Sequence, residues 1–267
     1  MALIEFKNVS FQYPNGFSAV EHVDFQIEQG ESIAIVGQNG AGKTTTVKMM
    51  NGLLKPTQGS VIIDGMDTKD FTAAQLSRKT GYVFQNPDDQ IFHNTVEAEI
   101  RFGPEVLGFD QKKTDSLVKF AAEITGLESD LDENPYNLPL SIRKFVTIAS
   151  VIAMDVDIFV LDEPTAGQDQ YGIQTLEKIL NILREKGKTI ITITHDMEYV
   201  VNNFQKVMVM AHKNLLCVDH PRKVFTQDDL LKESMLIPPY ISLLVKDLGI
   251  NKEILTQEEF IEYYLKQ

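Results

Sequence analysis

The apolar residues of this chain fall into short runs separated by turn-forming residues, a pattern that predicts a mixture of strands and helices. In the first third of the chain, such runs predict strands at residues 4–11, 19–27, 32–36 and 60–63. The turn Pro14-Asn15-Gly16 separates the first two strands. A glycine-rich loop follows the third strand and leads into a predicted helix at residues 42–54.

The middle of the chain has a different pattern. Between residues 87 and 154 the apolar positions repeat with a helical period, with breakers at Pro104, Gly126 and Pro135. After this segment strands and helices alternate again, with an amphipathic helix at 172–186 and strands at 158–161, 189–194, 206–210 and 215–218. Strands that alternate with helices predict a parallel sheet in an α/β core. From residue 225 onward the chain is short, acidic and helix-rich.

Composition narrows the classes of protein that remain. Of the 267 residues, 43% are hydrophobic and 24% charged, which is typical of a globular protein and excludes a disordered, collagen-like or disulfide-stapled chain. A net charge of −13 argues against a nucleic-acid partner, since phosphate binding needs a Lys/Arg surface. The single cysteine, Cys217, cannot form an intrachain disulfide and fits a reducing compartment. No apolar run approaches the ~18 residues of a membrane helix, so at a membrane other chains must span it.

The glycine-rich loop matches a phosphate-binding pattern. Residues 37–44 spell G-x-x-x-x-G-K-[ST] between an apolar strand and a predicted helix, which is the context this motif requires. Small residues let backbone N–H groups surround a phosphate at the helix N-terminus, and Lys43 adds a full positive charge. The Thr44 hydroxyl is placed for Mg²⁺ and that of Thr45 for the α-phosphate. The residues expected to bind nucleotide are Gly37, Gln38, Asn39, Gly40, Ala41, Gly42, Lys43, Thr44 and Thr45.

Two later strands end in polar residues at the edge where ligands bind parallel sheets. The strand at 158–161 leads into Asp162 and Glu163, and the strand at 189–194 into His195. Asp162 is placed to hold Mg²⁺, and Glu163 to polarise a water that attacks the γ-phosphate. His195 is placed to hydrogen-bond that phosphate. A more ordinary interpretation stays open, because acidic residues often end strands and a lone histidine is more often structural.

The order of these motifs resembles an ABC-transporter ATPase over nearly the whole chain. The motifs are the phosphate loop, Gln85 in Val83-Phe84-Gln85-Asn86-Pro87, the run from Leu161 to Thr165, and Thr194-His195-Asp196. The resemblance implies a P-loop NTPase fold with an antiparallel β subdomain and an inserted helical subdomain. It implies that Tyr13 stacks on adenine and that Gln85 contacts both Mg²⁺ and the catalytic water. The implied catalytic residues are Glu163, His195 and Gln85, and the implied metal ligands are Thr44, Gln85 and Asp162.

A narrower resemblance is to the ATPases of energy-coupling-factor (ECF) importers of vitamins and metals. It rests on Phe84-Gln85-Asn86-Pro87-Asp88-Asp89-Gln90 and on Leu236-Ile237-Pro238-Pro239 in the tail. It implies a nucleotide-binding core at 1–86 and 155–224, a helical subdomain at 87–154 and a helical extension at 225–267. The implied partners are a transmembrane coupling subunit and substrate-binding membrane subunits, with the ATPase at the cytoplasmic face of the membrane. The acidic candidates to receive arginine from the coupling subunit are Asp88, Asp89, Glu97 and Glu99; an ordinary solvated acidic face explains them equally well.

The signature motif departs from the family. Where such ATPases carry Leu-Ser-Gly-Gly-Gln, this chain has Leu138-Pro139-Leu140-Ser141-Ile142. Pro139 offers neither an N–H nor a hydroxyl, and side chains replace glycines where the backbone must approach a phosphate. The resemblance implies a head-to-tail dimer in which each ATP lies between one chain's phosphate loop and the other's signature, so we expect a heterodimer with a paralogous ATPase. The alternatives are a homodimer that tolerates this signature, a non-transport ABC ATPase, and an ATP-binding regulator without activity.

Overall fold

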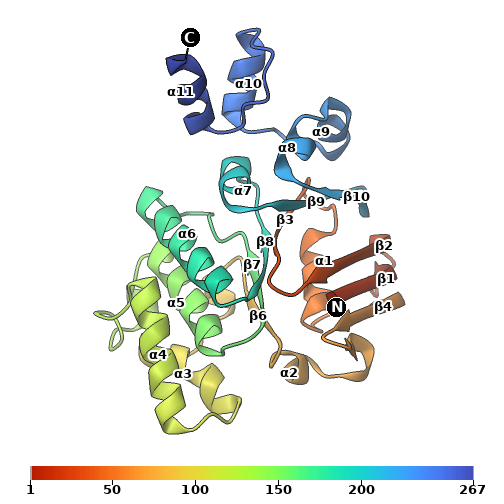
Figure 1. Ribbon diagram of the computed structural model, residues 1–267. Helices are drawn as coiled ribbons and strands as arrows, with labels where there is room; N and C mark the ends of the chain where they lie inside the picture. The colour runs from red at the N-terminus through yellow and green to blue at the C-terminus, as the bar shows by residue number, and fades with distance from the viewer. Residues whose placement is uncertain (1, 267) are drawn as a thin grey trace.

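The computed structural model describes residues 2–266 and contains two sheets that lie side by side (Figure 1). The smaller sheet is antiparallel, with the order β2-β1-β4-β5. Its strands are β1 (Ala2–Gln12), β2 (Ser18–Glu28), β4 (Gln58–Ile63) and β5 (Met66–Asp67). The three longer strands confirm the predictions for the N-terminal region, each extended by one or two residues at one or both ends.

The larger sheet has six strands in the order β10-β9-β3-β8-β7-β6, all parallel except β10. Its strands are β3 (Ser32–Val36), β6 (Thr80–Val83), β7 (Ile158–Asp162), β8 (Thr189–Ile193), β9 (Lys206–Ala211) and β10 (Asn214–Asp219). The parallel α/β core is therefore confirmed. The edge strand β6 was not predicted, since it is only four residues long and contains Gly81.

Both faces of the larger sheet are covered, and the alternation along β3 shows how. Ile33 and Ile35 point into a core shared with the antiparallel sheet and helix α1 (Lys43–Met50). Ala34 and Val36 point into a second core shared with helices on the opposite face. Helix α1 ends at Met50, four residues before the predicted end, because Gly52 adopts a left-handed conformation that stops the helix.

The helices between β6 and β8 cover the second core. They are α3 (Val96–Val106), α4 (Gln111–Thr125), α5 (Leu140–Ala153) and α6 (Gln170–Glu185), with short 3-10 turns at η2 (Pro87–Asp89) and η3 (Pro135–Asn137). Pro104 was expected to break a helix, but α3 continues through it to Val106. Only one intrahelical bond, that to the Ile100 carbonyl, is lost there, and Ile100 itself is fully buried in the core.

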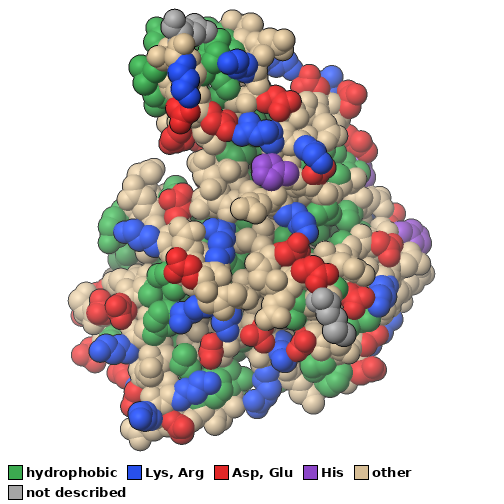
Figure 2. Space-filling view, viewed as in Figure 1, with side chains coloured by type: hydrophobic (Ala, Val, Ile, Leu, Met, Phe, Trp, Pro, Cys, Tyr) green, Lys and Arg blue, Asp and Glu red, His purple; other side chains and the backbone are tan. Residues whose placement is uncertain are grey.

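The last part of the chain forms a helical extension at the end of the molecule remote from α3 and α4 (Figure 1). After α7 (Met197–Asn203), its helices are α8 (Pro221–Phe225), α9 (Asp228–Ser234), α10 (Tyr240–Asp247) and α11 (Gln257–Leu265). Leu231 and Leu236 are buried in the second core, whereas Leu244 and Leu248 stay exposed. The extension is therefore anchored by its first half and leaves apolar side chains uncovered on its second half (Figure 2).

The charged surface of the face in Figure 2 carries acidic and basic side chains intermingled, without a broad basic patch. Among the helices of residues 2–266, none has the length and apolar character needed to cross a bilayer.

Candidate active site

The phosphate loop joins β3 to α1, and the backbone of neighbouring strands packs closely against it. Gly37 and Gly42 have φ values of 145° and 101°, a region that favours glycine. A Cβ atom at Gly37 would lie 2.0 Å from the Met210 carbonyl oxygen, and one at Gly42 would lie 2.5 Å from that of Ala19. Neighbouring strands thus demand glycine at both positions. The loop leads straight into α1, where unpaired N–H groups and the helix dipole favour an anion.

Lys43 spans the loop that precedes it. Its Nζ donates hydrogen bonds to the carbonyl oxygens of Gly37 and Gln38, at 2.7 and 3.0 Å. Burial lowers the pKa of Lys43, and the neighbouring Glu163 and Asp162 oppose that effect. The ammonium group is therefore held at the mouth of the loop by two carbonyls that a phosphate oxygen can supplement.

Asp162 lies at the end of β7 and meets the first turn of α1. Its Oδ2 accepts a hydrogen bond from the Tyr82 hydroxyl at 2.7 Å and lies 3.4 Å from Thr44 Oγ1. Burial raises the pKa of Tyr82, so this hydroxyl keeps its proton and orients the carboxylate. The hydroxyl and carboxylate oxygens that converge here are hard donors and suit Mg²⁺.

Glu163 occupies a strained and partly desolvated position. Its φ of 51° places a non-glycine residue in the left-handed region, a feature that clusters at functional sites. Burial raises its pKa to about 7, although the backbone N–H of His195 donates to the carboxylate and lowers the pKa in part. The side chain is thus poised to gain or lose a proton near neutral pH.

The His195 ring lies between the two charged groups. Its Nε2 is 3.3 Å from Glu163 Oε1 and 3.5 Å from Lys43 Nζ. Burial, and then the charge of Lys43, lower the pKa of His195. Three side chains from β3–α1, β7 and β8 therefore meet at one point, as expected for strands whose carboxyl ends share an edge.

An aromatic wall faces the phosphate loop. The Tyr13 hydroxyl lies 3.1 Å from Thr45 Oγ1, so the Thr45 hydroxyl already has a hydrogen-bond partner. The Phe17 ring lies 6.5 Å from that of Tyr13 and half exposed. Sequence reasoning selected Tyr13 and missed Phe17, although both flank the same turn.

These groups surround a cavity of about 420 Å³ at the carboxyl edge of the larger sheet. The predicted residues that line it are Tyr13, Asn39, Gly40, Gly42, Lys43, Thr44, Thr45, Gln85, Asp162, Glu163 and His195. The remaining predicted residues, Gly37, Gln38 and Ala41, lie outside the lining, where the first two supply carbonyls to Lys43. The sequence analysis did not identify two residues that support the site, Tyr82 and Lys144. Tyr82 binds the Asp162 side chain, and Lys144 binds the main chain of Glu163, a contact that no sequence motif marks.

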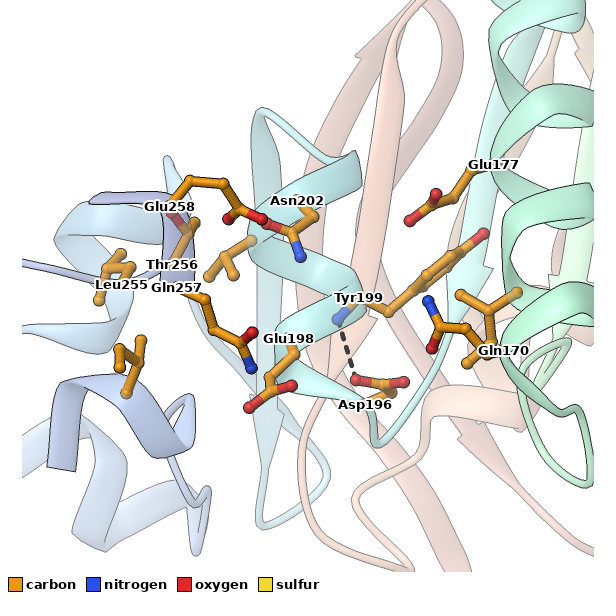
Figure 3. Close-up of a pocket in the computed structure, with 13 residues that line it drawn as sticks. Gln170, Glu177, Asp196, Glu198, Tyr199, Asn202, Leu255, Thr256, Gln257 and Glu258 are labelled. Carbon is orange, nitrogen blue, oxygen red and sulfur yellow. Dashed lines mark hydrogen bonds between the residues drawn. The ribbon is translucent and has the colours of Figure 1, made fainter. Parts of the chain in front are cut away.

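A second cavity, of about 250 Å³, lies between α6, α7 and the helical extension (Figure 3). Asp196 caps α7 there by accepting the Tyr199 N–H at 2.9 Å. Four of the described residues that line this cavity carry carboxylates and none is Lys or Arg; the four are Glu177, Asp196, Glu198 and Glu258. Such a wall repels phosphate, so this cavity is unsuited to a nucleotide.

Residues 138–142, which the sequence analysis places at the signature, lie at the start of α5. Pro139 is the N-cap and makes no side-chain hydrogen bond to the helix, and the Leu140 side chain is 51% exposed. Ser141, in the first turn of α5, is held to the loop after Glu163, because the Gln168 side chain donates a hydrogen bond to the Ser141 carbonyl at 3.0 Å. This helix start therefore presents an apolar side chain where the phosphate loop presents backbone N–H groups.

The four acidic candidates for docking differ in availability. Asp88 is 2.6 Å from Arg143 of the same chain, and Glu97 is 2.8 Å from Arg101. Glu99 is only 4% exposed, and its carboxylate accepts hydrogen bonds from the backbone N–H groups of Phe92 and His93. It is therefore an internal structural group rather than a surface one. Asp89 remains exposed.

The parallel sheet, the phosphate loop at the start of α1 and the carboxylates beside it define a P-loop ATPase. A match to the family described as "ABC transporter" covers residues 20–166, more than half of the chain. The protein belongs to the ABC transporter family, as an ATPase whose hydrolysis of ATP drives transport.

Relatives span nearly the whole chain. The energy-coupling factor transporter ATP-binding protein EcfA of Methanocaldococcus jannaschii is 38% identical over 251 residues, covering 93% of this chain and 90% of that protein. The structure of cbiO1 from Clostridium perfringens, part of the ABC transporter complex cbiONQ, is 30% identical with a TM-score of 0.78, covering 92% and 99% of the two chains. The ATP-binding cassette MJ0796, solved as a dimer with ADP and Pi, is 25% identical with a TM-score of 0.74, covering 82% and 98%.

Proposed function

We propose that this chain is the ATP-hydrolysing subunit of an ECF-type importer of vitamins or other micronutrients, located at the cytoplasmic face of the cell membrane. Its likeness to EcfA and to cbiO1 supports this assignment. In the proposal, a transmembrane coupling subunit and substrate-binding membrane subunits supply the transport path. The choice of substrate belongs to those membrane chains. Nucleic acid is not a partner.

ATP occupies the 420 Å³ cavity in this proposal. Backbone N–H groups from Gly40 to Thr44 and the Lys43 ammonium hold the β- and γ-phosphates, since the loop directs its donors and the helix dipole into the cavity. Tyr13 stacks on the adenine ring, with Phe17 as a second apolar contact on the same wall. The Thr45 hydroxyl is shared between Tyr13 and the α-phosphate.

The residues present fit a magnesium ion. Thr44, Gln85 and Asp162 all line the cavity and offer oxygen donors, and Tyr82 orients the Asp162 carboxylate through a hydrogen bond. When bound, Mg²⁺ neutralises charge that develops on the transferring phosphoryl group. The three side chains would hold the ion, and Gln85 would also orient the attacking water.

Glu163 acts as the general base in this mechanism. Its pKa of about 7 lets it accept a proton from water at neutral pH. His195 lies between Glu163 and Lys43, where its ring can hydrogen-bond the γ-phosphate oxygen that Lys43 also contacts. The lowered pKa of His195 favours the neutral ring, so it binds as a hydrogen-bonding group rather than as a second cation.

The observation that carries the heterodimer proposal is the contrast between the phosphate-loop site and the start of α5. Pro139 lacks the N–H and hydroxyl that a signature supplies to a γ-phosphate, and Leu140, the next residue, places an exposed apolar side chain at the same helix start. Each lost bond to a charged phosphate is worth ~1.5–3 kcal/mol. A homodimer would contain two weakened sites, whereas a paralogous partner with an intact signature completes the site on this chain.

Two surfaces support the proposed assembly. Phe92 and Phe102 form an exposed aromatic pair with ring centroids 4.8 Å apart, in the helical segment that follows Gln85, and suit docking of the coupling subunit. At the other end, exposed apolar side chains on α10, directly after it and on α11 suit contact with the partner ATPase; they include Tyr240, Leu244, Leu248, Ile261 and Tyr264.

A first test measures Mg-ATP hydrolysis by the purified chain alone. The proposal expects slow turnover without cooperativity in ATP concentration, abolished by Glu163→Gln. Vigorous, cooperative turnover by the chain alone would overturn the heterodimer and favour a homodimer of the metal-ion importer type. If the chain binds ATP and the Glu163→Gln variant has the same turnover as the wild type, the result would instead favour a regulator that does not use this site for catalysis.

A second test identifies the partners. The tagged chain is purified from its own host in a mild detergent, and the co-purifying chains are identified by mass spectrometry. The proposal expects a second ABC ATPase together with polytopic membrane proteins. Recovery of only soluble partners would contradict the transport role and favour a non-transport ABC ATPase.

A further inference from the structure

Lys144 is a buried cation that the proposed mechanism leaves unused. It lies on the second turn of α5 and is only 4% exposed. Its Nζ donates to the main-chain carbonyl oxygens of Glu163 at 2.8 Å and of Ala166 at 2.9 Å. A lysine is seldom buried unless its charge is compensated, so its location on a helix beside the Glu163 loop needs an explanation.

The carbonyl that Lys144 binds belongs to the strained residue of the site. Glu163 has a φ of 51°, and such a conformation persists only where the surroundings hold it firmly. Its N–H donates to the Ile193 carbonyl at 2.9 Å, which fixes one side of the residue to β8. Lys144 fixes the other side. Together these bonds determine the direction in which the Glu163 side chain leaves the backbone.

The same contacts connect the start of α5 to the loop after Glu163. Lys144 reaches Ala166, and Gln168 two residues further donates to the Ser141 carbonyl at 3.0 Å. Three hydrogen bonds therefore cross between the first two turns of α5 and residues 163–168 of the same chain. Because α5 belongs to the helical subdomain, a shift of that helix displaces the carbonyl group of Glu163.

We propose that Lys144 is a positioning residue for ATP hydrolysis: it locks the main chain of Glu163 and couples the position of α5 to the catalytic carboxylate of the same chain. This inference rests on the proposed role of Glu163. Lys144 is not among the residues that line the nucleotide cavity, so its contribution concerns the rate of the chemical step and not the affinity for ATP. A displacement of about 1 Å in a reacting group can cost ~10²-fold in rate.

The test compares Lys144→Met, which keeps the length of the side chain but lacks the donors, with Lys144→Arg, which keeps charge and donors. Lys119→Met, on the exposed surface of α4, is the matched control. For the complex purified with each variant, kcat and KM for Mg-ATP are measured. We expect Lys144→Met to lower kcat roughly 10- to 100-fold with KM unchanged, and Lys144→Arg to recover most of the loss.

A second readout is independent of activity. Hydrogen exchange of the full-length chain, followed by mass spectrometry, should become several-fold faster at residues 163–168 in Lys144→Met while β3 and α1 stay unchanged. Values of kcat and exchange like those of Lys119→Met would overturn the proposal. Loss of kcat with faster exchange throughout α5 and a lowered melting temperature would also overturn it, because that pattern describes a structural role.

The Glu163→Gln variant distinguishes a failure of the proposed catalytic role of Glu163 from a failure of the proposed role of Lys144. If Glu163→Gln retains turnover, the catalytic assignment of Glu163 is wrong, and the exchange experiment still decides whether Lys144 holds the loop. If Glu163→Gln abolishes turnover and Lys144→Met leaves kcat and exchange unaltered, the proposed function stands and the role of Lys144 is wrong.

Discussion

Two helices of this protein begin where an ATPase of its family is expected to contact phosphate, and they begin very differently. Helix α1 follows a loop whose glycines adopt positive φ values and expose backbone N–H groups. Helix α5 follows Pro139, which offers no N–H and no capping side chain, and its first residue, Leu140, is an exposed apolar side chain. Every helix N-terminus has unpaired N–H groups and a favourable dipole, yet only the first of these two is shaped to use them.

The difference extends to charge. Around α1 the site concentrates buried titratable groups, and the pKa values of Lys43, Glu163 and His195 are all shifted chiefly by burial. In the first turns of α5, Arg143 pairs with Asp88 and Lys144 turns inward to the Glu163 loop, so both cations are bound within the chain instead of directed at a ligand. An anion site therefore requires open donors and a cation directed at the ligand; a helix start by itself is insufficient.

The largest effect is expected from removing the cation of the α1 site. Lys43→Met should lower kcat/KM for Mg-ATP by ~10²–10³-fold, because the ammonium stabilises charge on the transferring phosphoryl group. Lys48→Met, in the last turn of the same helix, should change it little. The measurement is steady-state phosphate release by the purified complex. Equal effects of the two substitutions would show that helix integrity, and not the placed charge, distinguishes α1 from α5.

The next effect concerns the stability of the nucleotide-free protein. The pKa of Glu163 in the folded state, about 7, exceeds its ordinary value of 4.5, so the folded protein binds this proton more tightly than the unfolded chain. Its contribution to stability is present below pH ~4.5 and is lost as pH rises to about 7, by about 3 kcal/mol.

Urea unfolding in Mg²⁺-free buffer between pH 5 and 8 checks this prediction, with Glu163→Gln as the comparison. The free energy of unfolding of the variant minus that of the wild type should grow as pH increases across this range. A difference independent of pH would indicate that Glu163 is hydrated and that its site is no more strained electrostatically than the start of α5.

The smallest effect is a gain at the other helix. Pro139→Ser, Leu140→Gly, Ser141→Gly and Ile142→Gln, combined in one chain, should raise the ATPase activity of the chain alone about tenfold, since the restored donors recover part of the ~1.5–3 kcal/mol per phosphate contact. Ile142→Gln alone is the control, because it restores neither donor at 139 nor the close approach at 140 and 141. No gain from the fourfold variant would mean that the sequence of this helix start does not limit hydrolysis.

Much of the fold was predictable because its signals are local. The N-terminal strands, the alternation of strands and helices after residue 158 and the helical middle segment follow from periodicity and turn residues, and all appear in the structure. The exceptions have identifiable causes. The edge strand β6 is too short for a period to register, and Pro104 continues a helix because burial of α3 outweighs one missing hydrogen bond.

The sequence by itself determined the phosphate loop, since its residues are contiguous and its chemistry depends on their order. It also placed Asp162, Glu163 and His195 at strand ends, and the parallel sheet gathers such ends at one edge. Only the tertiary structure decided what surrounds them. Tyr82 and Lys144 lie 80 and 19 residues from the acidic residues they support. Tyr82 acts through one hydrogen bond and Lys144 through two, and none of these contacts leaves a periodic or motif signal.

Tertiary structure likewise decided the electrostatics. In the sequence, Asp88 and Glu97 cannot be distinguished from unpaired surface acids. In the folded chain, packing brings Arg143 to Asp88 and Arg101 to Glu97. The pKa of Glu163 and the strained backbone beneath it depend on burial and on neighbours from β8 and α5. Such quantities are set by distances between distant parts of the chain, because Coulomb and desolvation energies depend on spatial separation and not on sequence separation.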